Sequence, residues 1–412
     1  MLRIDLEEHR ASDPLQLSAA DVQYLMSEHA THVDLRWLKD GRYVITAKSF
    51  VGYIVISDVV ISIRPKVHNE NLIYMLTYLF KIPSGDTVQM ASDAENPMLD
   101  IIAMVLINRI KQLVKRGMFR GYIKKKEYIT GLKGKLPLSR NIFYTGKLYC
   151  EFDELSYSVY VNIILKSTLR LLLSMRMSRI VKEEAKTLIM IMSEISDIEI
   201  DEKLFSRLYY SQLNLHYKPL IDFCYLIYRS INIRNNAGIT QFSSFIINMN
   251  DIFEEFIRGY LKEMLYDYDV KRRSISNWAS STRQDLLPDI QPDIVIDGKL
   301  VIDVKYYRDL LTNHGKLNSS NLYQIITYMN VMNLPGLLIY PYNDIRLKDG
   351  FNLKAGNMFS VITLDLGGSF NSFQKALKDL LAYIDIIIKN DDVNKIVKRG
   401  DKISVTHVSS NL

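Results

Sequence analysis

Residues 287–311 read LPDIQPDIVIDGKLVIDVKYYRDLL, and this stretch decides the fold that we expect for the second half of the chain. Two short runs rich in β-branched residues, at about 293–296 and 299–304, are typical of buried strands. The dipeptide Asp297-Gly298 between them is a turn signal. The stretch therefore predicts a β-hairpin.

Charged side chains occur on these strands at a regular spacing. Asp303 and Lys305 are two positions apart, so their side chains leave the same face of the strand, while Val304 points the other way. Asp293 begins the first strand, ten residues before Asp303. The hairpin thus carries the pattern Asp-x9-Asp-Val-Lys.

This pattern suits metal-assisted hydrolysis of phosphodiesters. Mg²⁺ prefers hard oxygen ligands and keeps several waters, so two converging carboxylates, Asp293 and Asp303, suit it. A bound ion polarises a phosphate and lowers the pKa of a bound water. A lysine beside it, Lys305, supplies a compact positive charge that orients the water or stabilises charge on the phosphate.

The register of the hairpin decides whether the two aspartates share a site. A strict two-residue turn at Asp297-Gly298 pairs Asp293 with Ile302 and places Asp293 and Asp303 on opposite faces. A shared metal site needs an offset of one residue, either a three-residue loop that includes Lys299 or a bulge. We therefore expect one of these two features.

Two predicted helices flank the hairpin. The segment NDIFEEFIRGYLKEML (250–265) has apolar residues at helical spacing, and Glu254 or Glu255 on it is a candidate third carboxylate. A solvated surface charge is the alternative interpretation of Glu254. On the helix after the hairpin, Gln324 and Tyr328 lie one turn apart on one face.

The first half of the chain predicts a different organisation. Residues 54–63 predict a hairpin centred on Ser57-Asp58, and residues 71–82 and 98–117 predict helices, the first of which ends at Pro83. Residues 155–230 read as a helical layer, and an Asn/Arg/Gly-rich segment follows it. We therefore expect a mixed α/β (α+β) chain with an N-terminal domain, 1–235, and a second domain, 236–412.

Charge is distributed unevenly along the 412 residues. The formal net charge is +6, but residues 109–147 hold twelve basic residues and one acid, Glu127. This segment, here called the basic arm, therefore carries +11 and the rest of the chain −5. The arm is either a solvated hairpin or loop face, or an electrostatic contact with phosphates or an acidic partner.

Signals of export, membrane insertion and zinc binding are missing from the sequence. No apolar segment resembles a signal peptide or a membrane span, and the most apolar helical stretch is broken by Lys166 and Arg170. The two cysteines, Cys150 and Cys224, predict reduced thiols. The Cys and His spacing matches no zinc site. We expect a cytoplasmic protein without a membrane partner.

Several motifs together resemble a known family. Asp293, Asp303-Val304-Lys305, and Gln324 with Tyr328 resemble the PD-(D/E)xK nuclease fold. The chain as a whole resembles the McrC family, the nuclease subunits of McrBC modification-dependent restriction systems, which act in defence against phage. The resemblance implies that residues 1–235 are a partner-interaction domain and that residues 236–412 are a PD-(D/E)xK, restriction-endonuclease-like nuclease domain. The stretches that carry this resemblance are Gly52 with ISIRPKV (61–67), GLKGKLPL (131–138), DELSYSVYVNIILK (153–166), MNDIFEEFI (249–257), QPDIVID, VIDVKYY and LYQIITYM.

The resemblance implies a specific chemistry and a specific set of partners. It implies an Mg²⁺-dependent DNA endonuclease that acts on double-stranded, 5-methylcytosine-modified DNA and stimulates a separate AAA+ GTPase. The partner binds the GTP, since this chain has no G-x-x-x-x-G-K-[ST] motif, and cutting both strands suggests two nuclease subunits per assembly. The implied catalytic residues are Asp293, Asp303, Lys305, Glu254 and Gln324, and the implied metal-binding positions are Asp293, Asp303 and Val304.

Two alternatives remain open from the sequence. In the first alternative, the chain is a non-catalytic scaffold that activates the GTPase. In the second, it is a stand-alone repair or recombination nuclease of the same fold. About fifty residues follow the last apolar strand, near 359–364, and include the helical segment QKALKDLLAYIDIII, which has no assigned role.

Overall fold

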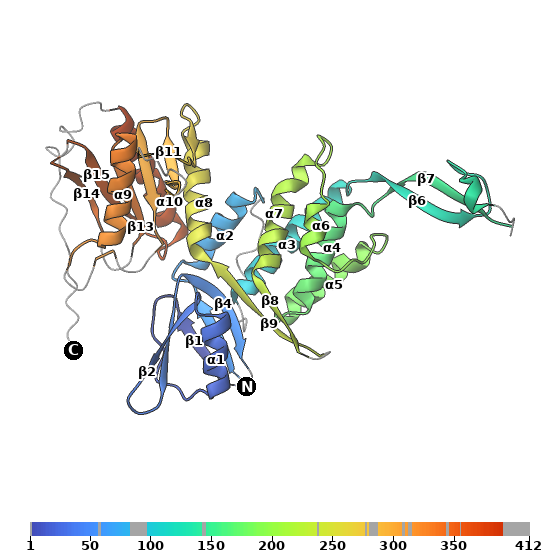
Figure 1. The fold of residues 1–412 in the computed structure, drawn as a ribbon, viewed down its shortest axis with the longest axis horizontal. Coiled ribbons are helices and arrows are strands. Elements are labelled where there is room, and N and C mark those ends of the chain that lie inside the picture. Colours follow the sequence, from blue (N-terminus) through green and yellow to red (C-terminus); the bar gives the residue numbers. More distant parts are fainter. Residues whose placement is uncertain are drawn as a thin grey trace. The chain divides into compact units, whose positions relative to one another are not determined.

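The computed structural model describes most of the chain, and its fold is mixed α/β as expected (Figure 1). The described residues are 2–56, 59–82, 97–141, 146–236, 239–276, 278–279, 287–306, 310–311, 315–342, 346–354 and 356–389. The expected turn at Ser57-Asp58 and the expected helix end at Pro83 lie outside them. Among the helices of this described part, none is both long and apolar enough to cross a membrane.

The contacts divide the chain into two units that differ from the expected boundaries. The first unit comprises residues 1–51, 56–79 and 247–412, and the second comprises 52–55 and 80–246. The expected boundary at 235/236 falls inside strand β8 (Ile231–Asn236), which pairs with β9 (Ile239–Asn248). The N-terminal segment therefore groups with the C-terminal half of the chain.

A six-stranded sheet forms the centre of the first unit (Figure 1). Strands β12, β13 and β15 run parallel, and β10, β11 and β14 are added antiparallel at the two sides. The order across the sheet is β10 (Val270–Lys271), β11 (Ile294–Ile296), β12 (Leu300–Val304), β13 (Gly336–Pro341), β15 (Met358–Leu364) and β14 (Lys348–Asn352). Parallel strands are usually covered on both faces, which explains why β12 and β13 read as continuous apolar runs and are fully buried.

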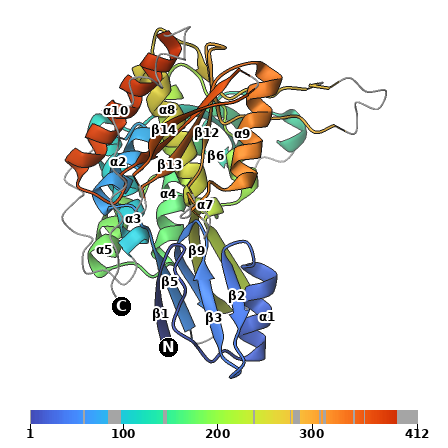
Figure 2. The same ribbon diagram turned by 90° about the vertical axis from the view of Figure 1, so that its left-hand side faces the viewer.

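Helices cover both faces of this sheet. α9 (Ser319–Met332) and α10 (Phe370–Lys389) lie on opposite sides of it (Figure 2). Under α9, Ile325 and Met329 pack on strand residues that include Val301. At Gly336 a Cβ atom would come within 2.5 Å of the Met329 sulfur, so this glycine allows α9 to approach β13 closely.

An aromatic cluster joins three helices of the first unit. α2 (Asn69–Leu79) contacts both α8 (Met249–Met264) and α10. The Tyr74 ring of α2 lies 5.9 Å from Phe256 of α8 and 6.2 Å from Phe373 of α10, measured between ring centroids. Aromatic pairs at these separations contribute attraction beyond their burial, so residues about 180 and 300 positions away from α2 hold it in place.

A second sheet combines three N-terminal strands with β9 and β8, in the order β1-β5-β4-β9-β8. Its elements are β1 (Leu2–Glu7), β4 (Phe50–Ile56) and β5 (Val59–Arg64), and the neighbouring elements are α1 (Ala19–Glu28), β2 (Val33–Trp37) and β3 (Tyr43–Ala47). β1 and β5 are parallel, from Leu2 opposite Val59 to Glu7 opposite Arg64. Gly52 in β4 has φ +128°, and a Cβ there would overlap the Phe245 carbonyl at 2.0 Å, so the position requires glycine.

The second unit is a helical layer from which a long hairpin extends (Figure 1). The helices are α3 (Pro97–Arg116), α4 (Tyr160–Leu173), α5 (Arg179–Ile191), α6 (Glu202–Ser206) and α7 (Lys218–Arg229), close to the expected ranges. β6 (Gly121–Ile129) and β7 (Leu148–Ser156) pair antiparallel from Gly121↔Ser156 to Ile129↔Leu148. The basic arm therefore contains strand β6, and the expected start of the helical layer at 155 falls in β7.

Candidate active site

The hairpin of β11 and β12 has the offset that a shared site requires. Ile294 pairs with Ile302 and Ile296 with Leu300, which leaves a three-residue loop, 297–299. The Lys299 N–H donates to the Ile296 carbonyl at 2.8 Å and closes this loop. Asp297 and Gly298 both have positive φ, 49° and 64°, as Asp-Gly pairs readily adopt. The predicted three-residue loop is confirmed.

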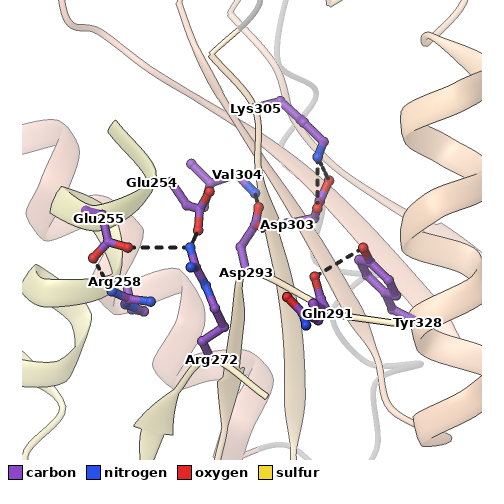
Figure 3. A network of polar contacts seen from close by, with 10 residues as sticks. All are labelled: Glu254, Glu255, Arg258, Arg272, Gln291, Asp293, Asp303, Val304, Lys305 and Tyr328. Carbon is purple, nitrogen blue, oxygen red and sulfur yellow. Dashed lines mark hydrogen bonds and ion pairs between the residues drawn. The ribbon is translucent and has the colours of Figure 1, made fainter. Parts of the chain in front are cut away.

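This register brings the two aspartates together at the end of the hairpin. Extending it by one residue places Asp293 opposite Asp303, on the same face of the sheet. The Val304 N–H donates to Asp293 Oδ2 at 2.8 Å, which holds the Asp293 side chain against β12 (Figure 3).

Asp303 and Lys305 form a buried ion pair beside Asp293. Asp303 is 0% exposed, the Lys305 side chain is 14% exposed, and Lys305 Nζ lies 3.0 Å from Oδ1 and 2.9 Å from Oδ2 of Asp303. Burial raises the pKa of Asp303 to about 7 against the opposing effect of Lys305, and the neighbouring Asp293 raises it further. Burial alone lowers the pKa of Lys305, but the two carboxylates outweigh it, so that this pKa is raised.

The donor groups at this point fit a divalent cation with oxygen ligands. The fully buried Asp303 and the partly buried Asp293 lie beside one lysine, and burial together with Asp293 raises the pKa of Asp303 despite Lys305. A cation between carboxylates offsets such repulsion. Val304 offers only its main-chain carbonyl. Within the described residues no group of three or more His, Cys, Asp or Glu side chains could hold a metal. An Mg²⁺ ion held by Asp293 and Asp303 would keep several water ligands, as this ion usually does.

Gln324 and Tyr328 of α9 lie one turn apart and bind each other, as the spacing predicts. Gln324 Nε2 donates to the Tyr328 hydroxyl at 2.8 Å, and that hydroxyl donates to the Gln291 carbonyl at 3.3 Å. Burial raises the pKa of Tyr328, and the charges of Asp303 and Asp293 raise it further. The tyrosine therefore lies near enough to feel the charges of the carboxylates, while its hydroxyl links Gln324 to the main chain at Gln291.

The carboxylates of α8 take another position. Glu254 and Glu255 both form ion pairs with Arg272, and Glu255 also contacts Arg258 (Figure 3). The structure therefore does not gather Glu254 with Asp293 and Asp303 into a three-carboxylate group. Arg272 was not identified from the sequence, because it belongs to the short segment VKRRS, which has no motif spacing.

A comparison with protein families identifies the chain. Residues 45–341 match the family model described as McrBC 5-methylcytosine restriction system component. The chain belongs to this family. The resemblance of the sequence motifs to the McrC family is thereby confirmed over most of the chain.

Two known proteins illustrate the relationship. The Type IV methyl-directed restriction enzyme EcoKMcrBC of Escherichia coli K12 is 28% identical over 342 residues, which cover 77% of this chain and 98% of the relative. A chain of the solved half-complex of Thermococcus gammatolerans McrB AAA+ hexamers with bound McrC has the same fold, with a TM-score of 0.62 and 18% identity. That match covers 92% of this chain and 100% of the other.

Proposed function

We propose that this McrBC-family chain is the DNA endonuclease subunit of a modification-dependent restriction system and cleaves phosphodiesters with Mg²⁺. The observation that carries the proposal is the convergence of Asp293, Asp303 and Lys305 on one sheet face at the end of β12. Asp303 is fully buried and the other two groups are partly buried, and a site of low polarity strengthens electrostatic interactions with a reacting phosphate.

Each residue has a distinct part in the proposed reaction. Asp293 and Asp303, with the Val304 carbonyl, would hold Mg²⁺, which supplies Lewis acidity and lowers the pKa of a bound water. Lys305 is fixed by Asp303 and presents its ammonium group to the attacking water or to charge that builds on the phosphate. The Gln324–Tyr328 pair borders the same face and would position DNA or the lysine. Glu254 stays a predicted catalytic residue, and its carboxylate pairs with Arg272 in this structure.

The proposed partner is an AAA+ GTPase of the McrB type. The T. gammatolerans structure is described as McrB AAA+ hexamers with bound McrC, and the E. coli relative as methyl-directed. The present sequence contains no G-x-x-x-x-G-K-[ST] motif. We therefore assign GTP to the partner, stimulation of its hydrolysis to this chain, and 5-methylcytosine-modified DNA to the complex as substrate.

The β6–β7 hairpin, whose first strand lies in the basic arm, is the proposed contact with that partner or with DNA. The side chains of β6 are largely exposed, whereas β7 buries Cys150 and Phe152; the exposed side chains of the hairpin include Tyr122, Tyr128 and Leu132. The β6 strand therefore presents an accessible face. Basic and aromatic side chains together suit a phosphate-bearing or acidic surface.

Substitution of the central residues tests the nuclease proposal. Asp303→Asn and Lys305→Ala are assayed for cleavage of methylated and unmethylated DNA in Mg²⁺ and GTP, together with an AAA+ GTPase of the McrB type. We expect cleavage of methylated DNA to fall about 100-fold or more, as when a charge-stabilising group is removed, and stimulation of GTP hydrolysis to remain. Chelation of Mg²⁺ abolishes cleavage in the unsubstituted complex.

The matched control is Lys378→Ala, which removes an exposed lysine from α10, far along the chain from the hairpin. It should cleave as the unsubstituted chain does. If Asp303→Asn and Lys305→Ala also cleave normally, the nuclease proposal is wrong and the chain is a GTPase-activating scaffold.

A further inference from the structure

Tyr306, the residue after Lys305, is anchored by side chains from the N-terminal strands of the first unit. It is 1% exposed, and alternation along the chain turns its side chain away from the face of Asp303 and Lys305. Its ring packs on Phe253 of α8, 5.6 Å away between centroids. We infer that Tyr306, Glu8 and Ser49, with Lys66, form a positioning group that holds the chain at Lys305 in place for cleavage; this inference rests on the proposed nuclease function.

The hydroxyl of Tyr306 is held by Glu8, the residue after β1. The hydroxyl donates to Glu8 Oε2 at 2.9 Å, and the main-chain N–H of Lys66 donates to the same oxygen at 3.0 Å. Glu8 is 2% exposed. A buried carboxyl group needs its donors, because an unpaired one costs its full desolvation energy. This contact therefore constrains both the tyrosine and the ends of β1 and β5.

The main chain of Tyr306 is held as firmly as its side chain. Ser49 Oγ donates to the Tyr306 carbonyl at 3.3 Å, and Lys66 Nζ donates to it at 3.5 Å. The same ammonium group lies 4.0 Å above the centre of the Tyr306 ring. The hydroxyl of Tyr306 is thus bound by Glu8, after β1, and its carbonyl by Ser49, before β4, and Lys66, after β5.

These anchors act where the sheet no longer controls the chain. The last ladder hydrogen bond of β12 runs from the Lys305 N–H to the Ile339 carbonyl at 2.9 Å. On one side of Lys305 lies this bond, and on the other lies Tyr306 with its contacts to Glu8, Ser49 and Lys66. The lysine backbone is therefore fixed from both sides, and its ammonium group meets Asp303 in one geometry. Small displacements of a reacting group reduce rates steeply.

Tyr306→Phe is the sharpest test, because it keeps the ring on Phe253 and removes only the hydroxyl. In the complex with the GTPase, we expect the single-turnover rate of DNA cleavage to fall about tenfold, while DNA affinity and GTPase stimulation stay unchanged. Tyr266→Phe, which alters a tyrosine 82% exposed at the end of α8, is the matched control and should cleave normally. Unsubstituted complex that fails to cleave contradicts the proposed function itself, so it is assayed first.

A double variant separates positioning of Lys305 from a general structural role. If Tyr306 acts through Lys305, then Tyr306→Phe with Lys305→Ala cleaves no more slowly than Lys305→Ala alone, to within about twofold. If the two substitutions instead slow cleavage independently, so that their fold losses multiply in the double variant, the inference is wrong. It is also wrong if Tyr306→Phe reduces cleavage and GTPase stimulation to the same extent.

Ser49→Ala keeps the inference testable if Tyr306→Phe does not fold. It removes one donor to the Tyr306 carbonyl and leaves the Glu8 contact in place. We expect a smaller loss of cleavage, about threefold, with GTPase stimulation retained. A normal cleavage rate in folded Ser49→Ala, or in folded Tyr306→Phe, overturns the inference.

Discussion

Burial raises the pKa of two carboxyl groups in the first unit, Asp303 and Glu8, to about 7. The two differ in what offsets the burial. Asp303 faces Lys305, in a site whose charge a cation would balance, whereas Glu8 lies among Lys66, Tyr306 and the adjacent Glu7. For Glu8 burial dominates, Lys66 and the two hydrogen bonds oppose it, and Glu7 adds to it. The Oε1 atom of Glu8 is buried and bonds to none of the described residues.

Glu8 therefore makes folding stability depend on pH. Because its pKa is higher in the folded state than the ordinary 4.5, the folded chain binds a proton more tightly. The resulting stabilisation is complete below about pH 4.5 and is lost as the pH rises to about 7. Within that range each pH unit changes the unfolding free energy by about 1.4 kcal/mol.

We predict that Glu8→Gln flattens this dependence. Between about pH 5 and pH 8 the unsubstituted chain should lose about 3 kcal/mol more stability than the variant. Denaturant unfolding at several pH values measures the difference. Glu7→Gln, at the partly exposed neighbouring position, is the control and should follow the unsubstituted chain more closely. Parallel curves for Glu8→Gln and the unsubstituted chain contradict the prediction.

Individual site residues differ in how far the sequence reveals them. Asp293, Asp303 and Lys305 were predictable because they lie on neighbouring strands, where strand alternation and turn length fix their faces. The Tyr306–Glu8 contact joins residues 298 positions apart, and no periodic pattern links them. The same reason applies to Arg272. It forms an ion pair with Glu254, the residue that the helix pattern had made a candidate third carboxylate of the site.

Elements were predictable where a local period identified them. The expected helices 98–117 and 250–265 correspond to α3, 97–116, and α8, 249–264, because apolar stripes and helix ends are local signals. Strand β8 was not expected, because INIRNN is polar and strand propensity depends on its pairing with β9. The parallel pairing of β1 with β5 was equally hidden, since it joins segments more than fifty residues apart.

The pairing of β6 with β7 changes the charge of the basic arm. The register sets Lys125 opposite Phe152 and Lys126 opposite Glu151, and both lysines form ion pairs with acids of β7, at Glu154 and Glu151. The acids of β7 lie just beyond residue 147, so the sequence window 109–147 overstates the charge of the hairpin. Exposed ion pairs of this kind contribute little stability, and their lysines remain accessible to a stronger anionic partner.

We predict that neutralising Lys124, Lys125 and Lys126 together to Gln weakens binding. Neutral residues are preferable to acidic ones here, because reversal would set like charges against Glu151 and Glu154 within the hairpin. Affinity for DNA and for the GTPase is measured separately between about 50 and 200 mM salt. If DNA is the ligand, the slope of log affinity against log salt should fall by up to about 3.

Neutralising three lysines elsewhere provides the control: Lys203, Lys262 and Lys378 to Gln. This variant should bind both ligands normally. Unchanged affinity of the arm variant for both ligands at the lowest salt shows that the arm is only a solvated face.

At the scale of the whole molecule, the proposed nuclease sheet and the N-terminal strands form one contact unit. From the sequence we expected two domains that follow each other along the chain, because a single sequence shows the order of its segments but not their long-range contacts. The contacts instead join residues 1–51 and 56–79 to 247–412, through Glu8 and Ser49 at Tyr306 and through α2 at α8 and α10. Asn71 of α2 also donates to the Leu366 and Gly368 carbonyls, each at 2.8 Å.

We therefore predict that fragment 236–412 does not fold stably on its own. Without residues 1–79 it exposes the apolar faces of α8 and α10 that α2 covers, and each large aromatic side chain left uncovered costs about 1.5–3 kcal/mol. It should show no cooperative thermal transition by circular dichroism and no cleavage of DNA. Addition of a separate 1–79 fragment should restore a transition, because the missing contacts come from that segment. A cooperative transition in fragment 236–412 alone, near the temperature of the full chain, would show that the sheet and its helices are an independent domain and that the N-terminal strands are not part of it.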